Sequence, residues 1–315
     1  MTLLLALFAC TATGDDSAAV TLTDGAVDAR LQEGTDYPAP GADDVLWYTP
    51  DLVIQPGEDV MYCVFGTYTG DDIGIHAFDT YQSDIGHHIV LMGTSASELD
   101  FADGEVIDCT ATNSLPMADL EPLILPTGGS VGVGGTTLPD GYAVKLRHGQ
   151  RWVIQGHWLN SSTEPQRVQD VAVMNTLPVD AVSEWAAPMV MNHQGFSLTP
   201  HEETHVSFDC TFEQDYNVLY FLGHMHEYGT HFSLDQLDAD GVPTSIYETA
   251  WDASYRDLPP VNAYAPGEYL LPAGTTMRTQ CTWTNTTDDV IVFPHEMCDA
   301  VAMVYPALTS DICSD

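Results

Sequence analysis

The sequence is short of basic residues. It has 7 Lys plus Arg against 46 Asp plus Glu, which gives a formal net charge of −39. Nucleic acids and anionic membrane surfaces both favour basic patches, so this composition excludes them as partners. The acidic residues are spread along the chain and form no single block, which favours a solvated acidic surface, as in a salty habitat. A second interpretation is that this surface attracts cations.

The sequence also lacks convincing amphipathic helices and any visible repeat of about 20 to 50 residues, so a propeller or solenoid is not expected. Instead it has many short runs of β-branched and aromatic residues separated by turn signals such as PDG at 139–141 and PAG at 272–274. We therefore predict an all-β chain with sandwich or jelly-roll architecture. Its length permits two compact domains, with the boundary at about residues 174–189.

The sequence lacks a long hydrophobic run at its N-terminus. The apolar stretch there covers only Leu3 to Ala9 and is too short to span a bilayer. The stretch ends at Cys10 and resembles a bacterial lipoprotein signal, which predicts lipidation of Cys10 and a cell-envelope location. An ordinary secretory signal is the alternative, and both interpretations export the protein. Residues 11–40 are rich in Ala, Thr, Asp and Gly and are predicted to form a flexible tether.

Beyond Cys10 the chain has an even set of six cysteines and no CxxC spacing. In an exported chain such a set predicts disulfides rather than thiolate metal ligands. The sequence alone leaves the pairing open. The cysteines are Cys63, Cys109, Cys210, Cys281, Cys298 and Cys313.

Six further residues fall into two groups, three on each side of the predicted boundary. The first group offers three imidazoles, and the second offers two imidazoles and a thioether. A single histidine or methionine is more often an ordinary surface or core residue, but alternating histidines on a strand share one face, as metal binding requires. Imidazole binds several metals, whereas a thioether favours Cu(I), so we predict two copper sites. The groups are His87, His88 and His157, and His224, His226 and Met297.

These residues lie in motifs whose order resembles that of the copper type II, ascorbate-dependent monooxygenases, the family of peptidylglycine alpha-hydroxylating and dopamine beta-monooxygenases. The resemblance runs from about Leu46 to the C-terminus. It rests on four stretches besides the Cys-containing MYCVFG. They are GHHIVLMG, LPDGYAVKLRHGQRWVIQGHWLN, HMHEYG, and LPAGTTMRTQCTWTNTT followed by EMCDAVAMVYP.

The resemblance implies two tandem β-sandwiches, residues 41–178 and 179–315, which face a cleft and hold one copper each. His87, His88 and His157 would bind the electron-transferring copper, with Gln155 orienting His157 or a water beside it. The catalytic copper at His224, His226 and Met297 would bind dioxygen and a small-molecule substrate, with ascorbate or another reductant as co-substrate. The chain is expected to be a monomer. The implied disulfides are Cys63–Cys109, Cys281–Cys298 and Cys210–Cys313.

The chain departs from the peptide-amidating enzyme at three positions. An arginine there holds the peptide carboxylate, whereas this chain has Leu222 at that position. An Asn and a Tyr of the same enzyme are replaced by Asp299 and Val301. Loss of the guanidinium removes the natural partner of a carboxylate, so a glycine-extended peptide is not the expected substrate.

Two other functions stay open. An exported copper-binding protein that sequesters or relays the metal would use the same ligands without oxidising a substrate. A surface β-sandwich lipoprotein that binds sugar or protein would carry only vestigial sites. Reductant-dependent oxygen consumption separates the first alternative from a monooxygenase, and metal analysis tests the second.

Overall fold

A computed structural model of the chain describes residues 23–24, 44–97, 100–110, 120–128, 135–256, 259–293 and 295–314. The side chains of residues 23–24, 87, 120–128 and 135 are outside this description. Cys10 and nearly all of the predicted signal and tether also lie outside the described residues. Within the tether, β1 (Thr23–Asp24) pairs with Val45 and Leu46.

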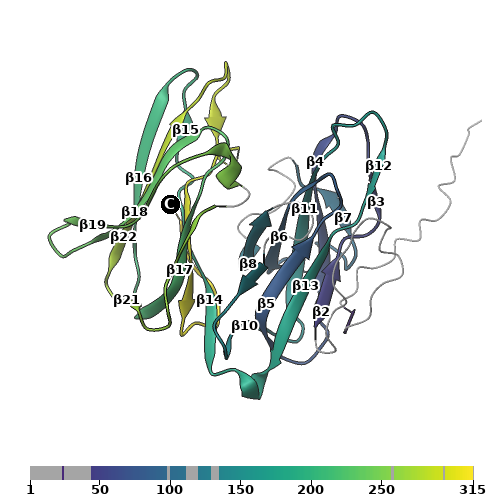
Figure 1. Cartoon of the computed structure of the whole chain (residues 1–315), viewed down its shortest axis with the longest axis horizontal. Helices are drawn as coiled ribbons and strands as arrows, with labels where there is room; N and C mark the ends of the chain where they lie inside the picture. Colours follow the sequence, from purple (N-terminus) through teal and green to yellow (C-terminus); the bar gives the residue numbers. More distant parts are fainter. Residues whose placement is uncertain are drawn as a thin grey trace, which may run out of the picture.

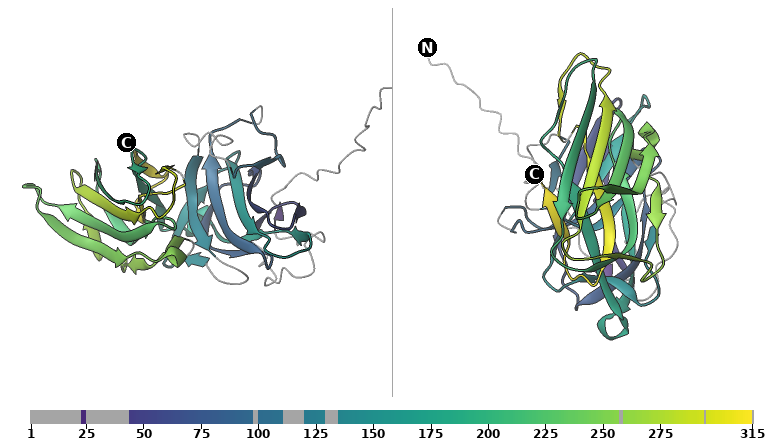
Figure 2. Two further views of the ribbon diagram at one scale, coloured as in Figure 1. Left: turned by 90° about the horizontal axis from the view of Figure 1, so that it is seen from above. Right: turned by 90° about the vertical axis from the view of Figure 1, so that its left-hand side faces the viewer.

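The described residues form strands, two short 3-10 helices and no α-helix, so the all-β prediction is confirmed. The 3-10 helices are η2 (Val179–Ala181) and η3 (Ala253–Arg256). The helix η2 separates the last strand of one sandwich from the first strand of the next, inside the interval 174–189. Figures 1 and 2 show the two sandwiches side by side along the long axis of the molecule.

The first sandwich consists of two main sheets and a two-stranded ribbon. One sheet has the order β2 (Val45–Tyr48), β13 (Val171–Pro178), β5 (Ile73–Tyr81), β10 (Tyr142–Leu146), with β9 (Gly135–Thr137) beside β5. The other has the order β7 (Val106–Asp108), β4 (Asp59–Thr67), β11 (Arg151–Leu159), β6 (Gly86–Thr94), β8 (Leu120–Gly128). The ribbon pairs β12 (Gln166–Val168) with β3 (Leu52–Ile54).

The second sandwich is built in the same way. Its first sheet has the order β14 (Glu184–Asn192), β24 (Asp299–Tyr305), β17 (Tyr216–His224), β20 (Val261–Ala263), with β21 (Tyr269–Leu271) on β17 and β25 (Asp311–Ser314) on β14. The facing sheet has the order β16 (Glu203–Thr211), β22 (Thr276–Thr284), β18 (Gly229–Leu237), β19 (Pro243–Ala250). The ribbon pairs β15 (Ser197–Leu198) with β23 (Ile291–Val292).

The two sandwiches follow the same strand path. The order β2-β13-β5, with β9 and β10 beside β5, corresponds to β14-β24-β17, with β20 and β21 beside β17, and β4-β11-β6-β8 corresponds to β16-β22-β18-β19. The ribbons β3–β12 and β15–β23 occupy matching places in the chain order. The structure therefore repeats one topology twice, at a spacing far longer than a solenoid repeat.

The sandwiches are joined through backbone and side chains. The strands β10 and β14 pair in parallel, which merges one sheet of each sandwich into a 12-stranded sheet. The rings of Tyr142 and Tyr305 meet edge to face across this joint, with centroids 4.8 Å apart. Pairing and packing together fix how one sandwich sits against the other.

The strands β17 and β24 are buried on both faces because each lies between two cores. Alternate residues of β24, such as Ala302 and Val304, face the core of the second sandwich, whereas Val301 and Met303 pack into a cluster shared with the first. Near-continuous burial of this kind explains their long apolar runs. By contrast, β22 alternates strictly between half-buried and buried positions, as a strand with one core face does.

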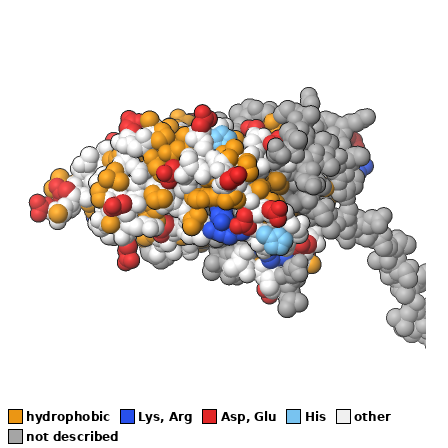
Figure 3. All heavy atoms as spheres, turned by 90° about the horizontal axis from the view of Figure 1, so that it is seen from below, with side chains coloured by type: hydrophobic (Ala, Val, Ile, Leu, Met, Phe, Trp, Pro, Cys, Tyr) orange, Lys and Arg blue, Asp and Glu red, His pale blue; other side chains and the backbone are white. Residues whose placement is uncertain are grey.

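On the face of the molecule shown in Figure 3, the acidic residues are dispersed. Figure 3 shows one long side of the molecule, where Asp and Glu side chains are scattered among apolar and neutral ones. Most of the described ion pairs have at least one exposed partner, as in Arg278 with Asp209 and Lys145 with Asp72. Exposed pairs of this kind contribute little to stability.

Candidate metal centres

The first centre lies on the sheet β4-β11-β6, where two of its three predicted ligands meet. His88 on β6 is the direct cross-strand partner of His157 on β11. Directly opposite residues on antiparallel strands project from the same face, and the two imidazole centroids are 4.9 Å apart at an interplanar angle of 70°. His87 precedes His88 on β6, and its side chain lies outside the described residues.

The ring of His157 is oriented by a carboxylate. Its Nε2 lies 2.5 Å from Oδ1 of Asp59, at the start of the neighbouring strand β4. Metal-binding histidines commonly donate their second ring N–H to a carboxylate, which fixes the tautomer and the ring. With Nε2 engaged by Asp59, Nδ1 is the nitrogen of His157 that suits a metal. Asp59 carries no motif of its own, and only the pairing of β4 with β11 brings it here.

Gln155 lies two residues before His157 on the same strand. Its amide Nε2 contacts the sulfurs of Cys63 and Cys109 at 3.8 and 3.6 Å. The structure thus places Gln155 against the disulfide of this sheet. The predicted role of Gln155 in orienting His157 or a water stays a prediction.

The second centre lies where the chain passes from β17 to β18, between the two sheets of the second sandwich. The rings of His224 and His226 have centroids 5.1 Å apart at an angle of 81°. Met225 between them is fully buried in the core, so the alternation holds through this segment. His226 Nδ1 lies 3.0 Å from the carbonyl oxygen of His295, the kind of partner that a metal-binding histidine commonly has on its other ring nitrogen.

The expectation that both histidines lie on a strand is wrong in one respect. The strand β17 ends at His224, and His226 lies in the turn before β18. The physical reason is a buried carboxylate. The backbone N–H groups of His226 and Tyr228 donate to Glu296 at 2.9 and 2.7 Å, in place of a strand neighbour.

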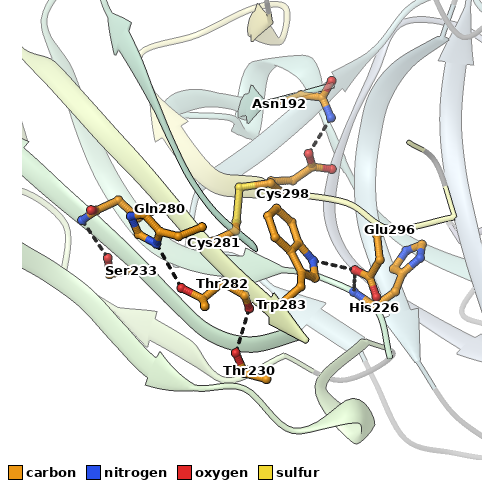
Figure 4. The surroundings of a disulfide bond; sticks show 12 residues. Asn192, His226, Thr230, Ser233, Gln280, Cys281, Thr282, Trp283, Glu296 and Cys298 are labelled. Atoms are coloured by element: carbon orange, nitrogen blue, oxygen red, sulfur yellow. Dashed lines mark hydrogen bonds between the residues drawn. A yellow bond between two sulfur atoms is a disulfide. The ribbon is translucent and has the colours of Figure 1, made fainter. Parts of the chain in front are cut away.

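The same carboxylate brings the Met297 segment to the histidines. Glu296 is fully buried and also accepts a bond from the indole Nε1 of Trp283 at 2.9 Å. Figure 4 shows Trp283, Glu296 and His226 in contact beside the Cys281–Cys298 disulfide. Because Met297 follows Glu296 directly and is half-buried, it lies in the neighbourhood of His224 and His226. Both carboxylate oxygens of Glu296 accept hydrogen bonds in this arrangement.

Two carboxyl groups near Met297 have perturbed acidity. Burial raises the pKa of Glu296, while the N–H donors of Tyr228, His226, Trp283 and Met297 lower it. Burial also raises the pKa of Asp299 to about 7, against the opposing effect of the Asn192 amide, which donates to it at 2.5 Å. Both carboxyl groups on the Met297 segment are thus held by neutral donors.

All three implied disulfides are present: Cys63–Cys109, Cys210–Cys313 and Cys281–Cys298. The first links β4 to the residue after β7 within one sheet. The other two each connect one sheet of the second sandwich to the facing sheet. Three disulfides are consistent with an extracellular or otherwise oxidising environment.

Two of the three positions that differ from the peptide-amidating enzyme are occupied by apolar packing. Leu222 and Val301 are direct cross-strand partners on β17 and β24. Both are buried in the cluster that the two sandwiches share. These two hydrocarbon side chains offer a carboxylate no cationic partner.

Among the side chains that the structure describes, no group of three or more His, Cys, Asp or Glu is arranged to hold a metal. Each centre has two described imidazoles, and its third predicted ligand is either His87, whose side chain is not described, or the thioether of Met297. The described donor set suits copper in its chemistry, with imidazole nitrogens at both centres and a soft sulfur near one. In the part of the chain that is described, no helix is long and apolar enough to cross a membrane.

No family model and no curated protein matches the chain. Among solved structures it is similar to one described as the STIV MCP, with 10% identity and a TM-score of 0.29 over 81% of this chain and 90% of that one. A structure titled for the triple jelly-roll fold of an archaeal virus has 9% identity and a TM-score of 0.24, over 86% of this chain and 58% of that one. The PBSX exported protein XepA has 10% identity and a TM-score of 0.22, over 82% and 86%. Likenesses this weak carry no argument about function.

Proposed function

We propose that the chain is an exported, copper-dependent monooxygenase that hydroxylates a C–H bond of a small organic substrate. One atom of dioxygen enters the product as hydroxyl and the other leaves as water, with two electrons from a reductant such as ascorbate. Copper bound at the two centres would supply the one-electron redox chemistry that dioxygen reduction requires. The observation that carries the proposal is the second centre, where paired imidazoles and a thioether-bearing segment are held together by Glu296.

The residues of the chain support this function by orientation. Asp59 holds the ring of His157 through Nε2, and the carbonyl of His295 holds the ring of His226 through Nδ1. Metal-binding histidines commonly have such a partner on their other ring nitrogen. The antiparallel pairing of β6 with β11 holds His88 and His157 side by side in one sheet, and the Cys281–Cys298 disulfide anchors the residue after Met297.

The substrate is proposed to lack a carboxylate at the position where peptide-amidating enzymes bind one. Leu222 and Val301 fill that position with buried hydrocarbon. A carboxylate placed there would lose its hydration without gaining a cationic partner, which is strongly unfavourable. Uncharged or cationic small molecules fit the site and the acidic surface better.

Oxygen uptake tests the proposal. Purified protein loaded with copper would be given ascorbate and a metabolite library, and products would be identified by mass spectrometry. We expect uptake that depends on reductant and substrate and yields a product heavier by one oxygen, with Met297→Ile as the inactive control. Copper binding without substrate-dependent uptake for any compound would favour the sequestration or relay function instead.

Export by a lipid anchor is the second part of the proposal. The three disulfides fit an oxidising compartment, and Cys10 is the residue that the N-terminal motif offers for lipidation. Labelling with a fatty acid in a bacterial host should mark the wild type and not Cys10→Ala. Equal labelling of both would contradict lipidation at Cys10.

A further inference from the structure

One local structure occurs in both sandwiches at matching places in the shared topology. Gln155, Trp158 and Asn160 in and after β11 correspond to Gln280, Trp283 and Asn285 in and after β22, at the same sequence interval in each case. The pattern continues in the following turn, where a hydroxyl residue lies two positions after each asparagine. The repetition is therefore one of sequence as well as of topology.

The two asparagines make equivalent contacts. Asn160 is fully buried, and its Nδ2 donates to the carbonyl oxygens of Ile54 on β3 and Glu164. Asn285 is also fully buried, and its Nδ2 donates to the carbonyl oxygens of Leu198 on β15 and Asp289. Since β3 and β15 correspond in the topology, the two turns have the same hydrogen-bonding pattern: in each, a buried asparagine joins the turn to the short strand of the ribbon. Because both side-chain amides are buried and hydrogen-bonded, the N-x-S/T patterns that these asparagines begin are not accessible to glycosylation in the folded protein.

Each tryptophan donates to a buried carboxylate. Trp158 Nε1 lies 3.2 Å from Oδ1 of Asp170, just before β13. Trp283 Nε1 lies 2.9 Å from Oε2 of Glu296, just before the corresponding strand β24. All four side chains are fully buried. Asp170 and Glu296 are thus counterparts.

Each carboxylate then holds the segment that bears the histidines of its own sandwich. Asp170 accepts bonds from Gln82 Nε2 at 2.8 Å and from the backbone N–H of Ser83 at 3.4 Å, in the turn before β6. Gln82 Nε2 also donates to the carbonyl oxygen of His88 at 3.1 Å. Glu296 accepts the N–H groups of His226 and Tyr228, in the turn before β18.

A buried carboxylate that is held by neutral donors is expensive, because burial removes its hydration and no cation replaces it. In the part of the chain that the structure describes, the hydrogen bonds to both carboxylates come from amide and indole N–H groups rather than from Lys or Arg. A stable fold has no need of such a group, and an apolar side chain would be the cheaper choice. Such a carboxylate occurs twice, once against the turn that leads into the His88 strand and once against the turn that bears His226, which points to a role at the metal centres.

We propose that Asp170 and Glu296 are paired positioning residues, Asp170 for the His88 segment of the first centre and Glu296 for the His226 segment of the second. The inference rests on the proposed function, since it assigns these residues to metal centres. Neither residue is a ligand. Each acts through hydrogen bonds that hold a turn in one conformation: Glu296 holds the turn that bears His226, and Asp170 holds the turn before β6, from which Gln82 reaches the backbone of His88.

The test uses the full chain without metal first. Hydrogen exchange is measured on the wild type, Asp170→Asn and Glu296→Gln, with the exposed Asp288→Asn as control. Each isosteric amide places an NH₂ where a donor now binds. We expect faster exchange at 82–88 only in Asp170→Asn, and at 225–229 only in Glu296→Gln. Trp158→Phe and Trp283→Phe keep the aromatic ring and remove one donor each, so they repeat the comparison should an amide variant fail to fold.

Copper titration then separates this inference from the proposed function. Affinity should fall about 10- to 100-fold at the first centre in Asp170→Asn and at the second in Glu296→Gln. The Cu(II) electron paramagnetic resonance signal of the other centre should stay unchanged. Two coppers in the wild type with both variants unaffected, or with both centres affected equally in each variant, would overturn the inference alone. A wild type that binds no copper would overturn the proposed function together with it.

Discussion

The two sandwiches share one strand path and differ in where their histidines lie. In the first, His88 and His157 oppose each other across two paired strands. In the second, His224 ends a strand and His226 lies in the turn that crosses to the facing sheet. The first pair is held by a backbone ladder, and the second by Glu296 and the Cys281–Cys298 disulfide.

This difference shows how one topology can supply two kinds of site. A ligand pair within a ladder has little freedom, because its backbone is fixed on both sides. A ligand pair in a turn is held by a few specific contacts, and these contacts can be removed one at a time. Under the proposed function, the ladder pair suits electron transfer, and the turn pair suits the site that must receive dioxygen and substrate.

The largest expected effect comes from breaking one disulfide at a time in the second sandwich. Cys210–Cys313 has a sequence separation of 103 and Cys281–Cys298 one of 17. In the chain-entropy model, loops of about these lengths are worth about 4.7 and about 3 kcal/mol. Replacing both cysteines of a pair by alanine should lower the unfolding free energy by these amounts, measured by urea denaturation.

The two disulfides should rank in the opposite order in their effect on copper binding. Cys298 follows Met297 directly, so loss of the smaller disulfide should impair the second centre more than loss of the larger one. Copper content per chain, measured beside the urea midpoints, checks this. A first centre that empties in either variant would contradict the view that the two sandwiches hold their metals independently.

The next effect is a pH dependence that arises in the first sandwich. Burial raises the pKa of Asp170 from its ordinary 3.8 to about 7. The folded protein therefore holds this proton more tightly than the unfolded chain. The resulting stability is fully present below about pH 4 and is lost as the pH rises through 7. At about 1.4 kcal/mol per pKa unit, the loss is on the order of 4 kcal/mol.

Urea midpoints between pH 4 and pH 8 measure this dependence. Asp170→Asn cannot ionise, so its stability should fall less over the same range than that of the wild type. Asp288→Asn, at an exposed position, should follow the wild type. Parallel curves for all three proteins would show that Asp170 has an ordinary pKa.

A smaller and more local effect is expected from His157→Ala. The variant removes one ligand of the first centre and leaves the second sandwich untouched. Copper content should fall by about one ion per chain, and the remaining ion should keep the spectrum of the second centre. Loss of both ions, or of neither, would argue against the division of ligands between the sandwiches.

Much of the fold follows from local sequence patterns. Turn signals and short β-branched runs predict the strands, and the alternation TMRTQCTWT predicts the single buried face of β22. The joint between the sandwiches could not be predicted from local sequence patterns. The parallel pairing of β10 with β14 and the double burial of β17 are long-range events, and a continuous apolar run does not identify what covers each face.

The centres were predictable in part for the same reason. The motifs place His88 beside His157 and His224 beside His226, as the structure does. Asp59 and Asp170 have no motif around them, and only the fold brings Asp59 to His157 and Asp170 to the turn before the His88 strand. Glu296 stands beside Met297 in the sequence, but its burial and its bonds to His226 and Tyr228 could not be read from that position. The shift of His226 out of the strand follows from those bonds.

The central claim is that the second centre is a copper site with a thioether ligand, and X-ray absorption at the copper edge tests it most directly. Reduced wild type should show a copper–sulfur shell, and Met297→Ile should lack it. The substitution nearly conserves volume, so its packing cost should stay under about 1.5 kcal/mol and the variant should still carry copper on its histidines. A wild-type spectrum with nitrogen or oxygen neighbours only would make Met297 a core residue and contradict the account.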